Sequence, residues 1–331
     1  MSDNGKFVYT GSNSAPLGCP TRVLGGDFLG PGNAGAYIPA SARIHKGWGF
    51  ASSIYTDDDV PREVPDRFTI AYFSYIENKL YRGEFALPRD SIARLFAAGF
   101  ASARARSGRG HYDELVAGMA PGGAVAVWLS GEGRQVEVFF GQAAVAHDDW
   151  HRATGFPPTV DRARMVTSVL DDAQEDDSLV REYRARLPLG LWAAYRTRYR
   201  WVPAAEGLPT PTRLSTVQYF NGERDAAVPV PFAHPTVAAG LPIPKFLTFA
   251  DRAAGLSYQT TFDFDETAAA LARAGVALGP PEAARTAPVG TPAELVFSRT
   301  PDGSAAELRV RRGAEVIPLR KAVVAVYRLR R

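Results

Sequence analysis

The sequence contains one cysteine, so it cannot form a disulfide within the chain. Cys19 lies in a segment flanked by prolines, with nothing nearby in the sequence to lower its pKa, and we interpret it as a loop cysteine and not as a nucleophile. Leu17-Gly18-Cys19 resembles the end of a lipoprotein cleavage site, but no apolar stretch precedes it.

Long apolar runs are also missing. No window approaches 18 consecutive apolar residues, which excludes a membrane-spanning helix. Residues 1–16 are polar and lack the apolar core of a signal peptide. We therefore expect a cytoplasmic location for the chain as given, and a periplasmic or lipid-anchored one if a native leader was removed.

Strong charge of one sign is absent. The net charge is +3 over 331 residues, and no long basic run occurs. Because nucleic-acid binders concentrate positive charge on one face, we expect no nucleic-acid partner. The slight excess gives a weak preference for an acidic partner. With 46% hydrophobic residues, 31 Gly and 25 Pro, the composition predicts a globular chain with many turns and short strands.

The clearest local pattern runs through residues 68–99. Aromatic and β-branched residues at 68–76 predict a strand, Asn78 suits a tight turn, and residues 80–87 predict the returning strand. Pro88 then fits a helix start, Ile92 and Phe96 share an apolar stripe, and Gly99 is a typical helix end.

The rest of the chain gives weaker signals of the same kinds. Strands are expected at 6–9, 22–24, 47–55, 124–130, 134–142, 214–220, 246–250, 256–264, 293–298, 305–310, 315–319 and 322–328. Helices are expected at 160–172, 178–186, 189–200 and 265–274. The glycine-rich segment 25–35 lacks the Lys and Ser/Thr of a P-loop, so we expect a structural loop. The proline-rich segment 203–211 predicts a boundary between domains 1–202 and 203–331.

The order of elements repeats along the chain. Tyr81 precedes Phe85 by four residues and Tyr258 precedes Phe262 by four, and each Phe leads into a helix that ends in Ala-Gly. A linker and a hairpin follow each helix. We predict an α+β fold of antiparallel sheets with a few packed helices, in two lobes of similar strand–strand–helix–hairpin order. Chance similarity between two-layer α+β domains is the alternative.

Several groups of residues contain side chains of the kinds used in catalysis or metal binding. His147 and His151 have the i, i+4 spacing of a helical zinc site, but Asp148 replaces the usual Glu and no third ligand is evident, so an exposed helix start is favoured. Ser130 lies in a hairpin turn and not in a nucleophile elbow. Asp263 and Asp265 could act as an acid–base pair, but a helix N-cap explains them better.

Arginine and aromatic residues alternate from 181 to 201. Base stacking and a protein-binding hot spot are possible interpretations. The simplest is that the arginines pair with the acidic run at 171–177, while the Trp and Tyr side chains are buried. No catalytic, metal or cofactor residue is predicted.

Specific blocks of the N-terminal part resemble a known family. They are Gly47-Trp48-Gly49, the block from Phe73 to Tyr81 (FSYIENKLY), Leu87-Pro88, and Pro121-Gly122-Gly123 followed by Val127-Trp128-Leu129. They resemble the bacterial domain-of-unknown-function family 2931 over about residues 7–201. Members are often described as lipoproteins, have no established catalytic residues, and often lie near genes of type VI secretion effectors. The resemblance therefore implies an immunity protein.

The function hypothesis follows from these points. We expect a non-catalytic protein-binding protein without cofactors, an immunity protein that neutralises a secreted antibacterial effector by occluding its active site. The alternatives are a hydrolase with an unrecognised site, which would need convergence of residues such as His111, His147 and His151 on a carboxylate, and an envelope-associated binding protein. Binding loops are expected at residues 56–63, 102–110 and 228–244.

Overall fold

The computed structural model describes residues 5–54, 60–102, 105–207, 212–230, 240–251, 254–287, 290–300 and 306–329. The chain forms two compact units, Met1–Trp192 (unit 1) and Ala193–Arg331 (unit 2). The domain boundary expected after residue 202 falls within β17 (Trp201–Glu206) of unit 2. The predicted α+β class with mostly antiparallel sheets is confirmed.

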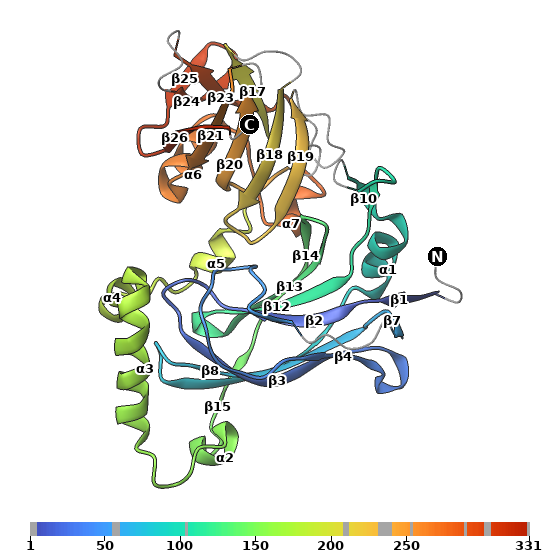
Figure 1. Ribbon diagram of the computed structural model, residues 1–331, viewed down its shortest axis with the longest axis vertical. Helices are drawn as coiled ribbons and strands as arrows, with labels where there is room; N and C mark the ends of the chain where they lie inside the picture. Colours follow the sequence, from blue (N-terminus) through green and yellow to red (C-terminus); the bar gives the residue numbers. More distant parts are fainter. Residues whose placement is uncertain are drawn as a thin grey trace. The chain divides into compact units, whose positions relative to one another are not determined.

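Unit 1 is built on two sheets that face each other (Figure 1). The first contains, in spatial order, β14 (Arg134–Gln142), β13 (Ala124–Gly131), β12 (Glu114–Met119), β2 (Thr10–Ser14) and β6 (Ser53–Ile54). The second contains β15 (Ala144–Ala146), β9 (Lys79–Ala86), β8 (Arg67–Ser74), β3 (Thr21–Leu29) and β4 (Gly35–Ile38), with β5 (Ser41–Ile44) also beside β3. A separate pair is formed by β1 (Lys6–Val8) and β7 (Pro61–Glu63).

Aromatic side chains fill the space between these sheets. Phe139 of the first sheet lies 5.2 Å from Phe85 and 6.3 Å from Phe68 of the second, measured between ring centroids. The Tyr72 hydroxyl donates to the Ala120 carbonyl at 3.1 Å. Rings of this size dominate core energetics, so they fix the distance between the two layers.

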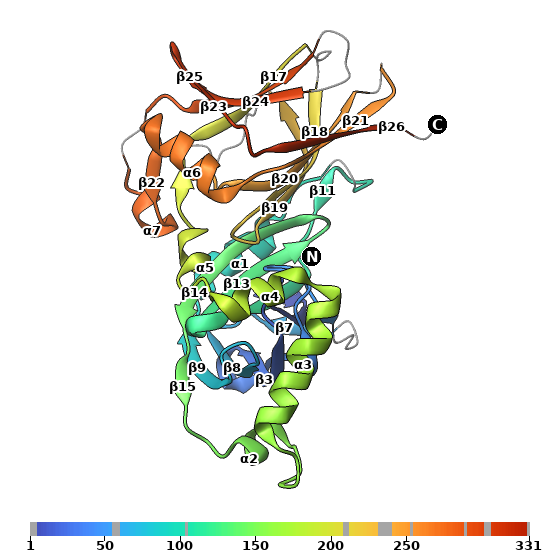
Figure 2. The ribbon, with the colours of Figure 1, turned by 90° about the vertical axis from the view of Figure 1, so that its left-hand side faces the viewer.

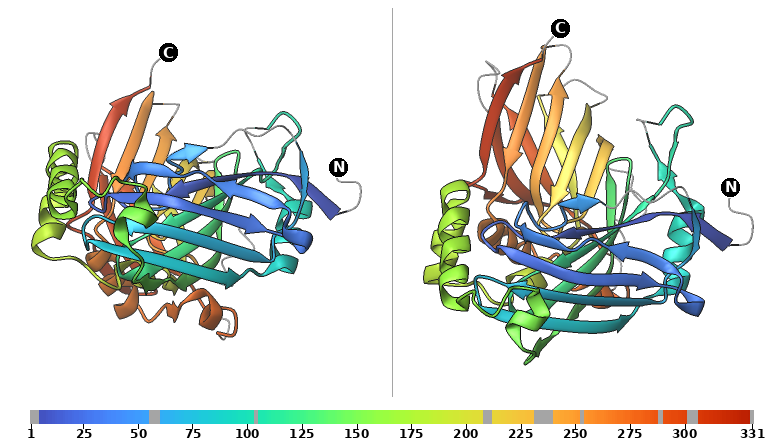
Figure 3. Two further views of the ribbon diagram at one scale, coloured as in Figure 1. Left: turned by 90° about the horizontal axis from the view of Figure 1, so that it is seen from below. Right: turned by 60° about the horizontal axis from the view of Figure 1, so that its bottom comes forward.

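Helices close the two ends of unit 1. The helix α1 (Arg89–Ala98) buries Ile92 and Phe96, and Gly99 ends it with a positive φ of 54°. At the opposite end of the strands, α3 (Arg162–Asp176) and α4 (Ser178–Ala185) lie side by side, after the short α2 (Trp150–Thr154) (Figures 1 and 3). The predicted helices at these three main positions are therefore confirmed.

Unit 2 also contains two sheets. The first is β17, β23 (Ala293–Arg299), β24 (Ala306–Arg312) and β25 (Glu315–Pro318). The second is β26 (Val323–Arg328), β21 (Leu256–Thr261), β20 (Pro244–Asp251), β18 (Thr212–Tyr219) and β19 (Arg224–Val230). The smaller elements are α5 (Leu191–Ala194), which crosses the boundary between the units, the strand pair β16 (Arg198–Tyr199) and β22 (Ala277–Gly279), α6 (Phe264–Arg273) and α7 (Pro281–Ala284). Phe297 packs between the sheets, 4.6 Å from Phe249 and 5.3 Å from Tyr258.

The two units share one topology. In unit 1 the second sheet runs β15-β9-β8-β3-β4, and in unit 2 it runs β26-β21-β20-β18-β19, with antiparallel neighbours in both. The first sheets run β14-β13-β12-β2 and β25-β24-β23-β17. In each first sheet, a strand that precedes the unit's helix α1 or α6 pairs in parallel with a strand that comes after it: β2 with β12, and β17 with β23. The predicted similarity of the two lobes therefore extends to the pairing of nine strands in each unit and the place of one helix.

Cross-strand partners follow the same correspondence. Tyr81 lies opposite Tyr72 on β8, and Tyr258 lies opposite Phe249 on β20. Two parallel strands must be joined by a crossover connection, whereas antiparallel strands need only a short hairpin. A parallel pair at the same place in both units is therefore hard to obtain by chance. We infer that the chain carries the same architecture twice.

Two glycine-containing segments differ from expectation. The predicted loop 25–35 is largely the hairpin of β3 and β4, and a Cβ on Gly35 would lie 1.7 Å from the Phe28 carbonyl oxygen. Glycine in these strands therefore marks close backbone approach, which the loop interpretation overlooked. The expected strand 47–55 is short, because Gly47 and Gly49 have φ of 129° and 78°, and β6 begins at Ser53.

Two predictions around the boundary were wrong. The expected helix 189–200 is reduced to α5, because Tyr199 exchanges backbone hydrogen bonds with Leu241 at 2.8 and 2.9 Å and so continues as strand. The expected linker 203–211 begins inside β17, where Pro203 is tolerated because this strand lies at the edge of its sheet.

Candidate partner-binding site

The candidate site centres on a hairpin that stands out from the rest of unit 1 (Figures 2 and 3). The 100–110 hairpin consists of β10 (Phe100–Ala101), a turn, and β11 (Arg109–Gly110). It begins directly after Gly99, whose positive φ turns the chain out of α1. Residues 103 and 104 lie outside the described residues.

Local hydrogen bonds hold the tip of this hairpin. The Ser102 amide donates to the Gly108 carbonyl at 3.0 Å, and the Gly108 amide donates to Ala105 at 2.9 Å. The Ser107 hydroxyl donates to the Arg109 carbonyl at 2.9 Å. These bonds connect the described residues on the two sides of the turn, and contacts that exist before binding lower the entropy lost on binding.

The base of the hairpin is anchored in the core. The Phe100 ring lies 4.9 Å from that of Tyr112, which is 4% exposed. The Arg134 guanidinium lies over Phe100, 5.6 Å from its centroid. A Cβ on Gly110 would meet the Phe100 ring at 2.5 Å, so glycine is needed for this contact.

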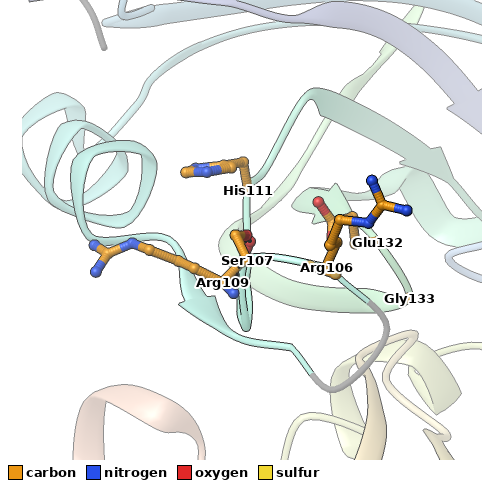
Figure 4. A pocket seen from close by; sticks show the side chains of 7 residues that line it. Arg106, Ser107, Arg109, His111, Glu132 and Gly133 are labelled. Atoms are coloured by element: carbon orange, nitrogen blue, oxygen red, sulfur yellow. Dashed lines mark hydrogen bonds between the residues drawn. The ribbon is translucent and has the colours of Figure 1, made fainter.

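A hollow of about 900 Å³ opens beside the tip (Figure 4). It is lined by Ala105, Arg106, Ser107, Arg109, His111, Glu132 and Gly133. His111 and the Arg109 guanidinium extend to one side, toward the neighbouring helix, while Arg106 and Glu132 lie on the other (Figure 4). Arg109 donates to the Ala98 carbonyl at the end of α1, where a positive charge is favoured by the helix dipole.

The hollow has a positive balance. Two arginines and a single carboxylate line it, and all three of these charged side chains are exposed. Arginine forms paired hydrogen bonds with carboxylates, so the chemistry suits an anionic group presented by a partner. Exposed charges of this kind steer encounter and set specificity more than they add affinity.

A second hollow, of about 500 Å³, lies on the outer face of the second sheet of unit 1. Gly26 and Gly83 lie on either side of Ile70 in neighbouring strands, and all three residues line this hollow. On its rim, Arg82 pairs with Asp148 at 2.7 Å. This hollow lacks the positive balance of the first.

The two histidines at i and i+4 do not lie on one helix. The helix α2 begins at Trp150 and is capped by Asp149, which accepts from the Arg152 amide at 2.8 Å. His147 therefore precedes the helix, and only His151 lies on it. Among the described residues no group of three His, Cys, Asp or Glu side chains could hold a metal ion.

The remaining candidate residues have structural roles. Ser130 is buried in β13 opposite Gln135. Cys19 is fully buried, and its pKa is raised well above the ordinary value by burial and by the carboxylates of Glu77 and Asp177. Asp263 caps α6 by accepting from the Glu266 amide at 2.8 Å, as predicted.

The cluster at 181–201 agrees with its simplest interpretation only in part, because Arg196 pairs with Glu282 and Arg198 with Glu223, outside the acidic run. Arg184 pairs with Asp171 of the acidic run at 2.6 Å. Trp192, Tyr199 and Trp201 are buried.

The sequence predicts a binding loop at 102–110, but it gives no signal for Glu132 or Gly133. These belong to the hairpin turn between β13 and β14, and only the fold brings the turn to Arg106. The other two expected binding loops, 56–63 and 228–244, fall partly outside the described residues, and their described parts include β7 and the end of β19.

The fold and this surface define a class: a duplicated α+β protein of two-sheet units with an open, positively charged hairpin site. The chain belongs to the family described as protein of unknown function (DUF2931), whose model matches residues 2–185. No curated protein and no solved structure matches it. Within the part of the chain that is described, no helix has the length and apolar character needed to cross a membrane.

Proposed function

We propose that this protein is a non-catalytic protein-binding protein, and that it acts as an immunity protein that neutralises a secreted antibacterial effector by covering the effector's active site. The observation that carries the proposal is the 100–110 hairpin, whose described residues are held by backbone hydrogen bonds and carry exposed, positively charged side chains. The proposal rests on the shape and chemistry of this surface together with the family.

The hairpin has the properties needed to enter a cleft. It stands out from a rigid two-sheet scaffold, and loops held in this way commonly carry binding. Hydrolytic enzymes often use carboxylates as general acids and bases. Arg106 at the tip could pair with such a carboxylate and block its access to substrate.

The hollow beside the hairpin supports a protein ligand over a small molecule. Small-molecule sites are concave and bury most of the ligand surface. Here the lining side chains are exposed, so their charges remain hydrated until a large surface covers them. A protein partner provides that surface.

Calorimetry between this protein and the product of the neighbouring gene tests the proposal. Arg106→Glu should weaken binding about tenfold or more, because it reverses the charge at the tip. Arg94→Glu is the matched control: Arg94 is exposed on α1, where it contacts Ser91 at 2.9 Å, and its replacement should leave affinity unchanged.

Cell survival provides the second measurement. Cells that express the neighbouring gene should die unless this protein is co-expressed, and Arg106→Glu should protect less well than Arg94→Glu. Absence of binding, together with survival in the absence of this protein, would refute the immunity role.

A further inference from the structure

We propose that the free edge of β26 in unit 2 binds an extended, acidic segment of a partner protein by strand addition. The inference goes beyond the proposed function, because it concerns a different surface and holds for any partner with such a segment. We call this surface the β26 edge: the side of Val323–Arg328 that faces away from β21.

The backbone of β26 offers hydrogen bonds along this edge. β26 pairs antiparallel with β21, and it ends its sheet among the described strands. The Leu329 amide donates to the Gly255 carbonyl at 2.8 Å, so odd-numbered residues direct their amides and carbonyls toward β21. Those of Val324, Val326 and Arg328 therefore point outward, as strand addition requires.

The side chains of β26 are those of an unprotected edge. Val323 is 65% exposed and Tyr327 is 51% exposed, while Val324 and Val326 pack against the core from the other face. Its sequence, VVAVYR, contains no proline, glycine or carboxylate. Natural sheets normally protect exposed apolar edges, so a bare one indicates a binding surface.

The equivalent edge strand of unit 1 is blunted. There, β15 has three residues, and Asp148 just after it pairs with Arg82 of β9. Since the two units share their topology, the difference is specific to β26 and does not follow from the fold.

Charge identifies the occupant. Arg320 and Lys321 precede β26 and Arg328 ends it, while the neighbouring β21, LSYQTT, carries no charge. Lys321 lies 3.6 Å from Asp263, and Glu266 accepts the backbone amides of residues 320 and 321 at the start of the strand. Once Lys321 is paired with Asp263, Arg320 and Arg328 remain as the positive charges at the two ends of β26. An incoming strand with carboxylates near its ends would match them.

The same charges argue against a second copy of this chain. Antiparallel pairing of two β26 strands about a two-fold axis brings the basic ends of one copy beside those of the other. Like charges across strands are destabilising. The occupant is therefore a segment of another protein, with apolar residues in its middle and acidic residues toward its ends.

A synthetic peptide tests the proposal with the full-length protein. Valine and threonine alternate in its middle, and glutamates stand at both ends; a second peptide carries lysines in place of the glutamates. Calorimetry should detect binding of the first peptide, weakened by added salt, and at least about tenfold weaker binding of the second.

Two pairs of variants locate the binding. Val326→Pro removes an outward amide without removing a hydrogen bond to β21, and it should weaken binding of the glutamate peptide about tenfold or more. Val326→Ala keeps the amide and should bind this peptide more tightly than Val326→Pro does. Arg328→Glu should weaken binding and Arg94→Glu should not, which keeps the test decisive if Val326→Pro does not fold.

Three results would overturn the proposal. One is equal binding of the two peptides, or none of the first. Another is undiminished binding by both a folded Val326→Pro and Arg328→Glu. The third is self-association in sedimentation that Val326→Pro abolishes, which would assign the edge to a second copy.

Discussion

Buried polar residues determine how β2 occupies the interior of its sheet. Asn13 donates to the Pro39 carbonyl at 2.7 Å, and the Ser14 hydroxyl donates to the Gly47 carbonyl at 2.9 Å. These bonds replace part of the hydration that these fully buried side chains lose on folding. The segment TGSNS has no apolar alternation, so its place between two strands could not be predicted from the sequence.

Cys19 gives a prediction at the same scale. Burial and two nearby carboxylates raise the pKa of its thiol, so the reactive thiolate is suppressed in the folded protein. A thiol reagent at pH 8 should modify Cys19 only when the chain unfolds, which mass spectrometry across a denaturant series would measure. Rapid modification under native conditions would contradict the burial.

The same shift predicts a pH dependence of stability. Because the unfolded thiol ionises at a lower pH than the folded one, the free energy of unfolding should fall as pH rises above the ordinary thiol pKa. Cys19→Ala should lose this part of the alkaline destabilisation, measured as the dependence of the urea midpoint on pH, although other buried groups such as Tyr72 contribute at higher pH.

At the scale of elements, local signals predicted the hairpin of β8 and β9, the helix α1 and the hairpin of β13 and β14. Asn78 has the positive φ expected of its turn, at 53°. The failed elements depend on distant partners: the helix expected at 189–200 gives way to the bridge between Tyr199 and Leu241. The hollow beside the 100–110 hairpin is lined by two turns distant in sequence, and local sequence patterns do not show that these turns meet.

Helix caps provide a prediction for elements. Asp177 accepts from the Leu179 amide at 3.1 Å as the cap of α4, and it also accepts from the Gly18 amide at 2.6 Å. Asp161 caps α3 through one amide, that of Arg164, at 2.7 Å. Asp161→Ala should cost about 1 kcal/mol of stability, and Asp177→Ala about 2 kcal/mol, the upper end for caps.

Urea unfolding monitored by circular dichroism would measure both. Equal costs for the two variants would mean that the bond to Gly18 adds nothing to the stability of unit 1.

At the scale of the whole molecule, the chain carries one architecture twice, and each unit has its own core. The core cluster around Phe297 and Tyr258 draws its residues from unit 2, and the cluster around Phe68 and Tyr72 draws its residues from unit 1. The repeated Tyr and Phe spacing pointed to this duplication, but the pairing order of the strands was needed to establish it. Family membership is carried by residues 2–185, within unit 1.

Equivalent helices test whether the units unfold separately. Ile92 on α1 and Leu271 on α6 are both fully buried. Ile92→Ala and Leu271→Ala should each cost roughly 2–5 kcal/mol. If each unit unfolds on its own, calorimetry should show two transitions, with each variant lowering one of them; a single transition lowered by both would show that the units unfold together.

The central claim is that the protein recognises another protein through its positively charged hairpin. Its most direct test is calorimetric titration with the product of the neighbouring gene, comparing Arg106→Glu with Arg94→Glu. The account predicts tight binding by the natural protein and the Arg94 variant, and about tenfold or more weaker binding by the Arg106 variant. Equal affinity of all three proteins, or no binding by any of them, would contradict it.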